Sequence, residues 1–144
     1  MVSKKALTLA FAAALFAQAA QADIQHIVVV KSQANTDAGT KADIAKRFLA
    51  LKDVAKRDGQ PYIVSITGGR AISKEGSDQQ LEQAFIVTFK NAADRDYFVR
   101  KPYRNTMDPD HLALATIVEP LLHRDVDGKV TGLFIFDFND GAER

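Results

Sequence analysis

The strongest constraint on the fold is a pair of strand-like segments, one near each end of the chain, that are apolar on both faces. The first is IQHIVVVK, residues 24–31, and the second is LFIFDF, residues 133–138. Because side chains alternate between the two faces of a strand, Val28 and Ile135 point one way while Val29 and Phe134 point the other. A sheet that contains both segments needs cover on both of its faces.

The first 22 residues have the pattern of a cleavable export signal. Lys4 and Lys5 precede an uncharged run at residues 6–17, and Ala20-Gln21-Ala22 places small residues where signal peptidase cuts. The run is too short for a spanning helix, which needs about 20 apolar residues. We predict a signal peptide over residues 1–22, a domain over residues 23–144, and a destination in the periplasm or outside the cell.

The remaining chain is long enough for one domain with its own core. It contains no cysteine, so disulfides and thiol chemistry are excluded. The net charge of the whole chain is +1, and loss of Lys4 and Lys5 brings it close to zero. We therefore expect no nucleic-acid partner and, after signal cleavage, no attachment to a membrane.

Hydrophobic periodicity predicts a first helix over residues 41–58. Thr40 and Asp43 resemble a capping box, an apolar stripe contains Ile44 and Phe48, and Gly59 is a natural stop. Strands are predicted over residues 62–67 and 81–89. The pair Gly68-Gly69 should end the first of them, and residues 71–80 should form an exposed connection.

Two shorter helices are predicted in the second half. Asn91 is a candidate N-cap for one, with Tyr97 and Phe98 on its buried side, and Pro102 interrupts it. Asp108-Pro109 begins the other, and a buried stripe is expected at Leu112, Ile117 and Leu121.

The order of elements is therefore β-α-β-β-α-β, the ferredoxin-like α+β unit with helices on one face of a four-stranded sheet. Those helices leave the second apolar face of the sheet open to water. A second copy of the chain packed against that face would cover it. The pattern thus predicts a homodimer.

Three stretches together resemble the stress-responsive dimeric α/β-barrel family, known as Dabb domains. They are IQHIVVVK, AFIVTFKNAADRDYFVRKP and LFIFDF, which span nearly the whole chain after the signal. The resemblance implies two protomers with their sheets face to face, and an internal pocket. One plant member closes a polyketide ring without a cofactor, using His and Tyr, so the resemblance implies no cofactor.

Carried over residue by residue, the resemblance points to His26 and Tyr97 as catalytic or ligand-binding residues. The family's His-Pro-x-His segment reads Lys101-Pro102-Tyr103-Arg104 here, so both of its histidines are absent. Arg104 stands in place of the second and becomes a candidate ligand-binding residue. Arginine stays protonated and is a poor general base, which argues against cyclase-type chemistry.

Each candidate also has a structural interpretation. His26 shares a face with Val28 and Val30; if that face is the barrel interior, its ring could bind a ligand or transfer a proton. Alternatively, it is a core histidine satisfied by a neighbour such as Tyr97. Tyr97 could be a core residue with its hydroxyl at the boundary, and Arg104 a solvated charge.

The segment Asp108-Pro109-Asp110-His111 contains metal-ligand residue types, but it reads equally well as a helix start. We predict no metal site. The sequence leaves three functions open. The protein could bind a small, largely apolar molecule in the barrel pocket, act there as a cofactor-free enzyme, or serve as a non-catalytic interaction module in stress.

Overall fold

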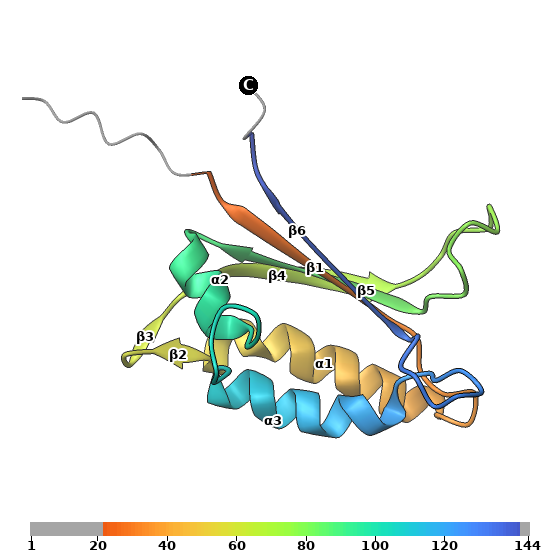
Figure 1. The fold of residues 1–144 in the computed structure, drawn as a ribbon. Coiled ribbons are helices and arrows are strands. Elements are labelled where there is room, and N and C mark those ends of the chain that lie inside the picture. Colours follow the sequence, from red (N-terminus) through yellow and green to blue (C-terminus); the bar gives the residue numbers. More distant parts are fainter. Residues whose placement is uncertain (1–21, 142–144) are drawn as a thin grey trace, which may run out of the picture.

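A computed structural model describes residues 22–141 of the chain. It shows a four-stranded antiparallel sheet in the order β4-β5-β1-β6 (Figure 1). The strands are β4 (Ile63–Arg70), β5 (Gln83–Phe89), β1 (Ile24–Val30) and β6 (Leu133–Asn139). The predicted α+β class and ferredoxin-like order are confirmed. The predicted signal peptide lies outside the described residues, apart from Ala22.

All the helices cover one face of this sheet (Figure 1). They are α1 (Ala38–Val54), α2 (Ala92–Phe98) and α3 (Pro109–Val118), and α3 runs into the 3-10 turn η1 (Glu119–Leu121). A small hairpin, β2 (Lys56–Arg57) and β3 (Gln60–Pro61), follows α1. No helix in residues 22–141 has the length and apolar character needed to cross a membrane.

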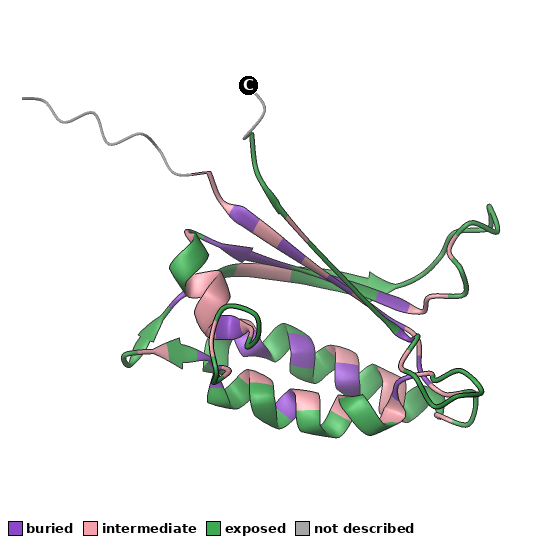
Figure 2. Ribbon diagram, in the orientation of Figure 1, coloured by how far each residue is buried: buried purple, intermediate pink, exposed green. Residues whose placement is uncertain are grey.

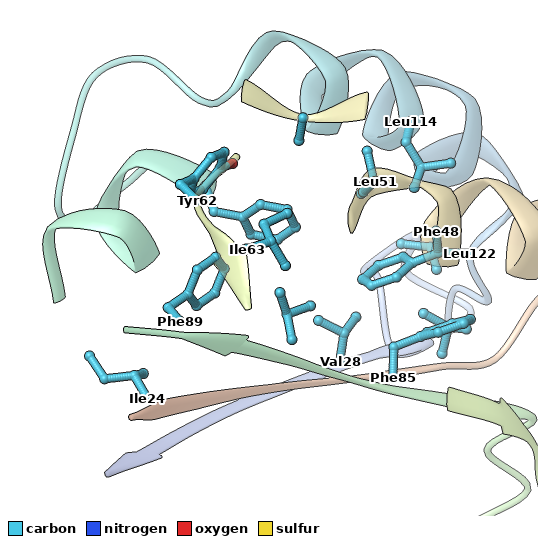
Figure 3. Close-up of a cluster of buried hydrophobic side chains, with 14 residues drawn as sticks. Ile24, Val28, Phe48, Leu51, Tyr62, Ile63, Phe85, Phe89, Leu114 and Leu122 are labelled. Atoms are coloured by element: carbon cyan, nitrogen blue, oxygen red, sulfur yellow. The ribbon is translucent and has the colours of Figure 1, made fainter. Parts of the chain in front are cut away.

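The hydrophobic core fills the space between the sheet and the helices (Figure 3). Phe85 and Phe89 of β5 are buried, and Phe85 stacks on Phe48 of α1 with 4.2 Å between ring centroids. Phe98 at the end of α2 is fully buried and packs on Phe89. These aromatic contacts fix both helices against the same face of the sheet.

The first helix begins and ends earlier than its sequence predicts. Its N-cap is Asp37, whose side chain accepts a hydrogen bond from the Thr40 backbone N–H at 2.9 Å. It ends at Val54, so the predicted bounds of 41–58 are wrong at both ends. Gly59 lies in the β2–β3 turn with a φ of +76°, a conformation that suits glycine. The glycine signal therefore marked a hairpin and not the helix end.

Strand β4 continues through Gly68 and Gly69 to Arg70, so these glycines do not end it. A Cβ atom on Gly68 would lie 2.4 Å from the Ala84 carbonyl oxygen of the neighbouring strand. Glycine is therefore required here for close strand pairing.

Helix α3 buries a different stripe from the predicted one. Leu112 and Ile117 are each 45 % exposed, whereas Leu114 is buried. The Asp108-Pro109 start is correct, since Asp108 caps the helix and Pro109 is its first residue. The prediction thus chose the wrong face of the helix as the buried one. Apolar residues occur all round α3, so hydrophobic periodicity does not indicate which face packs on the core.

The sheet face opposite the helices is apolar and open, as the alternation of β1 and β6 predicts. Figure 2 shows that β6 is exposed along most of its length. Phe134, Phe136 and Phe138 are 51 %, 52 % and 41 % exposed. They pair across to Val29, Ile27 and Gln25 of β1, which share the same face. These three phenylalanines form an aromatic strip of β6 on the face of the sheet that the helices leave uncovered.

Candidate functional site

A cavity of about 400 Å³ lies between the sheet and the helices, within one chain. Apolar side chains from β1, α1, β5, α3 and β6 form most of its wall. Two histidines, His26 of β1 and His111 of α3, also face it. Arg100, Lys101 and Glu119 contribute charged groups. The cavity thus suits a small, largely apolar molecule with a few polar groups.

His26 lies in the sheet wall of this cavity and is 1 % exposed. It faces the helices together with Val28 and Val30, so it does not point at the open sheet face where a second copy would pack. Its direct neighbour across the β1–β6 pair is Asp137. The Nδ1 atom of His26 lies 2.6 Å from Oδ1 of Asp137. The partner of His26 is therefore Asp137, and the predicted partner, Tyr97, is not in contact through a hydrogen bond.

A second layer of contacts holds Asp137 in place. Its other carboxylate oxygen accepts a hydrogen bond from Arg95 of α2. Arg95 also contacts Asp96 at 2.8 Å, and its guanidinium lies over the Tyr103 ring, 3.9 Å from the centroid. Both oxygens of Asp137 are thus engaged, and the carboxylate cannot rotate away from His26 without breaking a charged contact.

These contacts fix the proton arrangement of the His26 ring. A carboxylate only accepts hydrogen bonds, so Nδ1 carries the proton and Nε2 of the neutral ring is free to accept one. Burial lowers the pKa of His26 below its ordinary value, while Asp137 opposes that effect. The ring is therefore neutral near pH 7. A proton taken up at Nε2 would produce an imidazolium that Asp137 stabilises.

His111 enters the same cavity from the first turn of α3. Its ring stacks on Phe98 at 3.9 Å, and its Nδ1 lies 2.9 Å from the Phe98 carbonyl oxygen. Burial lowers the pKa of His111 to about 4. The sequence singled out His111 only as part of a metal pattern, whereas the structure places it beside the candidate site.

In the segment Asp108-Pro109-Asp110-His111, Asp108 acts as a helix cap. It is fully buried, and its Oδ1 accepts hydrogen bonds from the backbone N–H groups of Asp110 and His111. Its Oδ2 accepts one from the Tyr62 hydroxyl at 2.9 Å. Residues 22–141 bring together no cluster of three or more histidine or acidic side chains suited to a metal ion.

Tyr97 and Arg104, the two other predicted site residues, lie together but outside this cavity. They line a neighbouring surface hollow, which shares Arg100 and Met107 with the cavity wall, and the Arg104 guanidinium lies 4.7 Å from the centroid of the Tyr97 ring. The Tyr97 hydroxyl donates to the Lys56 carbonyl oxygen at 3.2 Å. Lys101, by contrast, does line the cavity. The structure therefore separates His26 from the two residues that were expected to share its ligand.

Comparison with known proteins agrees with this architecture. The family model described as "Stress responsive A/B Barrel Domain" matches residues 24–140. The hydroxynitrile lyase of Passiflora edulis superposes with a TM-score of 0.65 at 15% identity, over 86% of this chain and 98% of that one.

Two further solved structures are similar. A protein of Arabidopsis thaliana, At3g17210, gives a TM-score of 0.60 at 16% identity, covering 81% of this chain and 93% of its own. A dimeric protein of unknown function from Bacteroides fragilis gives a TM-score of 0.56 at 16% identity, covering 81% of this chain and 95% of its own. A search of curated proteins finds no match. Since the family model covers most of the chain, the protein belongs to the stress-responsive A/B barrel (Dabb) domain family.

Proposed function

We propose that this protein binds a small, largely apolar molecule in the cavity between sheet and helices, and that a hydroxyl of the molecule donates a hydrogen bond to Nε2 of His26. The observation that carries the proposal is the buried His26–Asp137 pair in an otherwise apolar wall. Burial of the ligand's apolar surface supplies most of the affinity, roughly 25 cal/mol per Å². The fixed orientation of the His26 ring then favours molecules that place a hydroxyl group opposite Nε2.

The proposal includes export and self-association. Export is supported by the basic, apolar and small-residue pattern of residues 1–22. Association of two copies through the open sheet face is supported by the exposed aromatic strip of β6. Several similar structures are described as dimeric. In such a dimer each copy keeps its own cavity, because the cavity lies on the other side of the sheet.

Native mass spectrometry of protein from the exported fraction tests binding and export together. We expect a chain that begins at Asp23 and carries the extra mass of a retained molecule. The variant His26→Leu should lose that mass, or bind the extracted molecule about five- to tenfold more weakly, because one hydrogen bond is worth about 1 kcal/mol.

His123→Leu is the matched control for this experiment. His123 is the third histidine of the chain; its Nδ1 contacts Thr131, and it does not line the cavity. It should bind like the wild-type protein. Equal loss in both variants, or a wild-type protein that neither retains nor rebinds any molecule, would contradict the proposal.

The same geometry favours a second candidate, a cofactor-free enzyme in which Nε2 of His26 removes a proton from a hydroxyl group of the substrate. The arrangement of Asp137, Nδ1 and a free Nε2 is the one a general base requires. The similar fold of a hydroxynitrile lyase shows that this architecture supports an enzyme. Release of benzaldehyde from mandelonitrile is a direct assay. If the wild-type protein releases no benzaldehyde, or if His26→Gln releases it as fast as the wild type, the enzyme hypothesis is wrong for mandelonitrile.

A further inference from the structure

The segment that links α2 to α3, residues 99–108, joins the two helices on the covered side of the sheet (Figure 1). A surface hollow of about 450 Å³ lies against it. We call it the arginine hollow, and its polar wall consists of Tyr97, Arg100, Arg104, Asn105 and Thr106. The hollow shares Arg100 with the cavity, whereas Tyr97 and Arg104 are not part of the cavity wall. Ligand binding by His26 therefore gives this hollow no role.

The two arginines of the hollow lack an acidic partner in the described part of the chain. Arg57, on the other side of Tyr97, pairs with Asp94 at 2.8 Å. Arg100 and Arg104 form no ion pair within residues 22–141. The Arg104 backbone N–H donates to the Arg100 carbonyl oxygen at 2.9 Å, which closes one turn, and both side chains line the hollow. Like charges one turn apart repel each other, and an anion between them would replace that repulsion with two attractions.

Arg104 is held in place before any anion binds. Its guanidinium lies over the Tyr97 ring, 4.7 Å from the centroid, and one of its N–H groups donates to Oγ1 of Thr106 at 3.2 Å. Tyr97 is fixed in turn, because its hydroxyl donates to the Lys56 carbonyl oxygen and its ring packs edge-on against Tyr62. A guanidinium that stacks through its face keeps donors along its edge. Such an edge suits two parallel hydrogen bonds to a carboxylate or phosphate group.

The rest of the wall indicates that the anion carries a compact apolar group. Met107, Pro109 and Leu112 form the apolar part of the hollow, and none of its lining residues has an acidic side chain. Leu112 is 45 % exposed, so an apolar group in the hollow would remove part of this side chain from water. The volume of the hollow is in the range of small-molecule sites.

We propose that the arginine hollow is a second binding site, outside the His26 cavity, for a small organic anion. The carboxylate or phosphate group of the anion accepts hydrogen bonds from Arg100 and Arg104, and its apolar group lies on Leu112. Tyr97 is a positioning residue that holds Arg104. The proposed function is not required for this site, because Tyr97 and Arg104 do not line the cavity.

Titration of the wild-type protein with matched compounds, followed in ¹H–¹⁵N NMR spectra at low ionic strength, tests this inference. Benzoate and phenyl phosphate are anions, and benzamide has the shape of benzoate without its charge. We expect benzoate, phenyl phosphate or both to move the Nε–H signal of Arg104 and the backbone signals of residues 97–112. Benzamide should move neither. The anion that binds more tightly identifies the group that the site takes. Acetate and inorganic phosphate should bind more weakly than their aryl counterparts, because they cannot cover Leu112.

Two pairs of variants assign the contacts. Arg104→Gln should bind the anion about tenfold more weakly, since a hydrogen bond to a charged group is lost. Arg70→Gln is its control, because Arg70 is exposed at the end of β4 and its replacement removes the same charge. Tyr97→Phe keeps the ring under Arg104 and should bind like the wild type. Tyr97→Leu removes the ring and should bind more weakly than Tyr97→Phe.

Binding of benzamide as tight as that of the anions, or no binding of either aryl anion, overturns the proposal. Equal weakening in Arg104→Gln and Arg70→Gln also overturns it, because net charge alone would then explain the affinity. Acetate and inorganic phosphate that bind as tightly as the aryl anions would show that Leu112 is not part of the site.

His26→Leu separates this site from the cavity. Anion binding should persist in this variant even if the molecule retained in the cavity is lost. Loss of anion binding in His26→Leu would place the anion in the cavity and overturn the second site. The wild-type comparison of benzoate, phenyl phosphate and benzamide needs no substitution, so it decides the question even if a variant does not fold.

Discussion

At the residue scale, burial has the largest effect on the pKa of His26, while Asp137 determines which ring nitrogen carries the proton. Asp137 raises the pKa of His26 against the lowering effect of burial, and Arg95 lowers it. In Asp137→Asn the raising effect is lost while Arg95 keeps its charge, so the pKa of His26 should fall further. The amide can also donate to Nδ1, which would move the ring proton to Nε2 and abolish the acceptor.

An NMR titration of the His26 ring measures this change directly. Asp140→Asn is the control, since Asp140 contacts Gln25 near the end of the same strand and does not touch His26. In Asp137→Asn alone we expect a lower His26 pKa and about fivefold weaker binding of the molecule that the wild-type protein retains. An unchanged pKa would show that the His26–Asp137 contact does not set the ring's protonation.

His111 gives the protein a specific dependence of stability on pH. Its pKa is lowered to about 4 by burial, whereas an unfolded histidine has an ordinary value of 6.5. The unfolded chain therefore binds more protons between these two values, so the free energy of unfolding falls as the pH drops from about 6.5 towards 4. From pH 7 to pH 5 the contribution of His111 is on the order of 2 kcal/mol.

Urea unfolding at pH 7 and pH 5 checks this expectation. The lowered pKa of His26 reduces the stability of both proteins over the same interval, whereas the lowered pKa values of Asp37 and Glu82 act only in more acidic solutions, because the ordinary values of these groups are 3.8 and 4.5. His111→Phe should therefore lose less stability than the wild type over the same interval. An equal loss in the two proteins would mean that His111 is readily protonated in the folded state.

Part of this site could be predicted from residue types, and part required the fold. His26 was predicted because it sits in an apolar strand and matches the first-strand histidine of the family that the sequence resembles. Asp137 lies 111 residues away, and only the register between β1 and β6 brings it opposite. His111 was read as a helix-start residue, which is correct for its backbone. The direction of its ring depends on the rotation of α3, which the uniformly apolar pattern of that helix does not specify.

At the scale of elements, α3 depends on Asp108 for both its start and its attachment. The carboxylate caps the helix through two backbone N–H groups and accepts the buried Tyr62 hydroxyl. Burial and Asp108 raise the pKa of Tyr62, so its hydroxyl remains a donor. Asp108→Ala should cost about 2–4 kcal/mol, from loss of the cap together with an unsatisfied hydroxyl.

Urea unfolding of Asp108→Ala measures that cost, and Asp110→Ala is the control in the same helix turn. Asp110 is exposed, so its replacement should change stability by less than about 1 kcal/mol. Equal stability losses in the two variants would show that Asp108 is an ordinary cap with no anchoring role.

The elements themselves were largely predictable, and the errors share one cause. Strand positions followed from apolar runs rich in β-branched residues, and Asn91 and Asp108 were correct as caps. The first helix was misplaced because Asp37 and Thr40 both suit an N-cap, and Gly59 suits either a helix end or a hairpin. Gly68 suits either a strand end or a close strand pair. In each case a local signal permits two structures, and contacts from distant segments decide between them.

At the scale of the whole molecule, the sheet separates two apolar regions that serve different purposes. The helix-covered side contains the core and the cavity. The open side carries the aromatic strip of β6 and the exposed Ile86 of β5, without charged residues among them. Apolar side chains gathered in this way on one face are typical of an interface between proteins.

Phe136→Lys tests whether two copies meet through this face. Phe136 is 52 % exposed and pairs with Ile27 midway along the β1–β6 ladder, so a lysine there would bury a charge in the interface. Val126→Lys is the matched control, because Val126 is fully exposed on a turn away from the sheet. Sedimentation should show a dimer for the wild type and Val126→Lys, and a monomer for Phe136→Lys. Since the cavity lies across the sheet from Phe136, that monomer should still bind the molecule that the wild-type protein retains. A Phe136→Lys protein that dimerises as tightly as the wild type would place the interface elsewhere, and a monomer that loses binding would show that the cavity depends on the second copy.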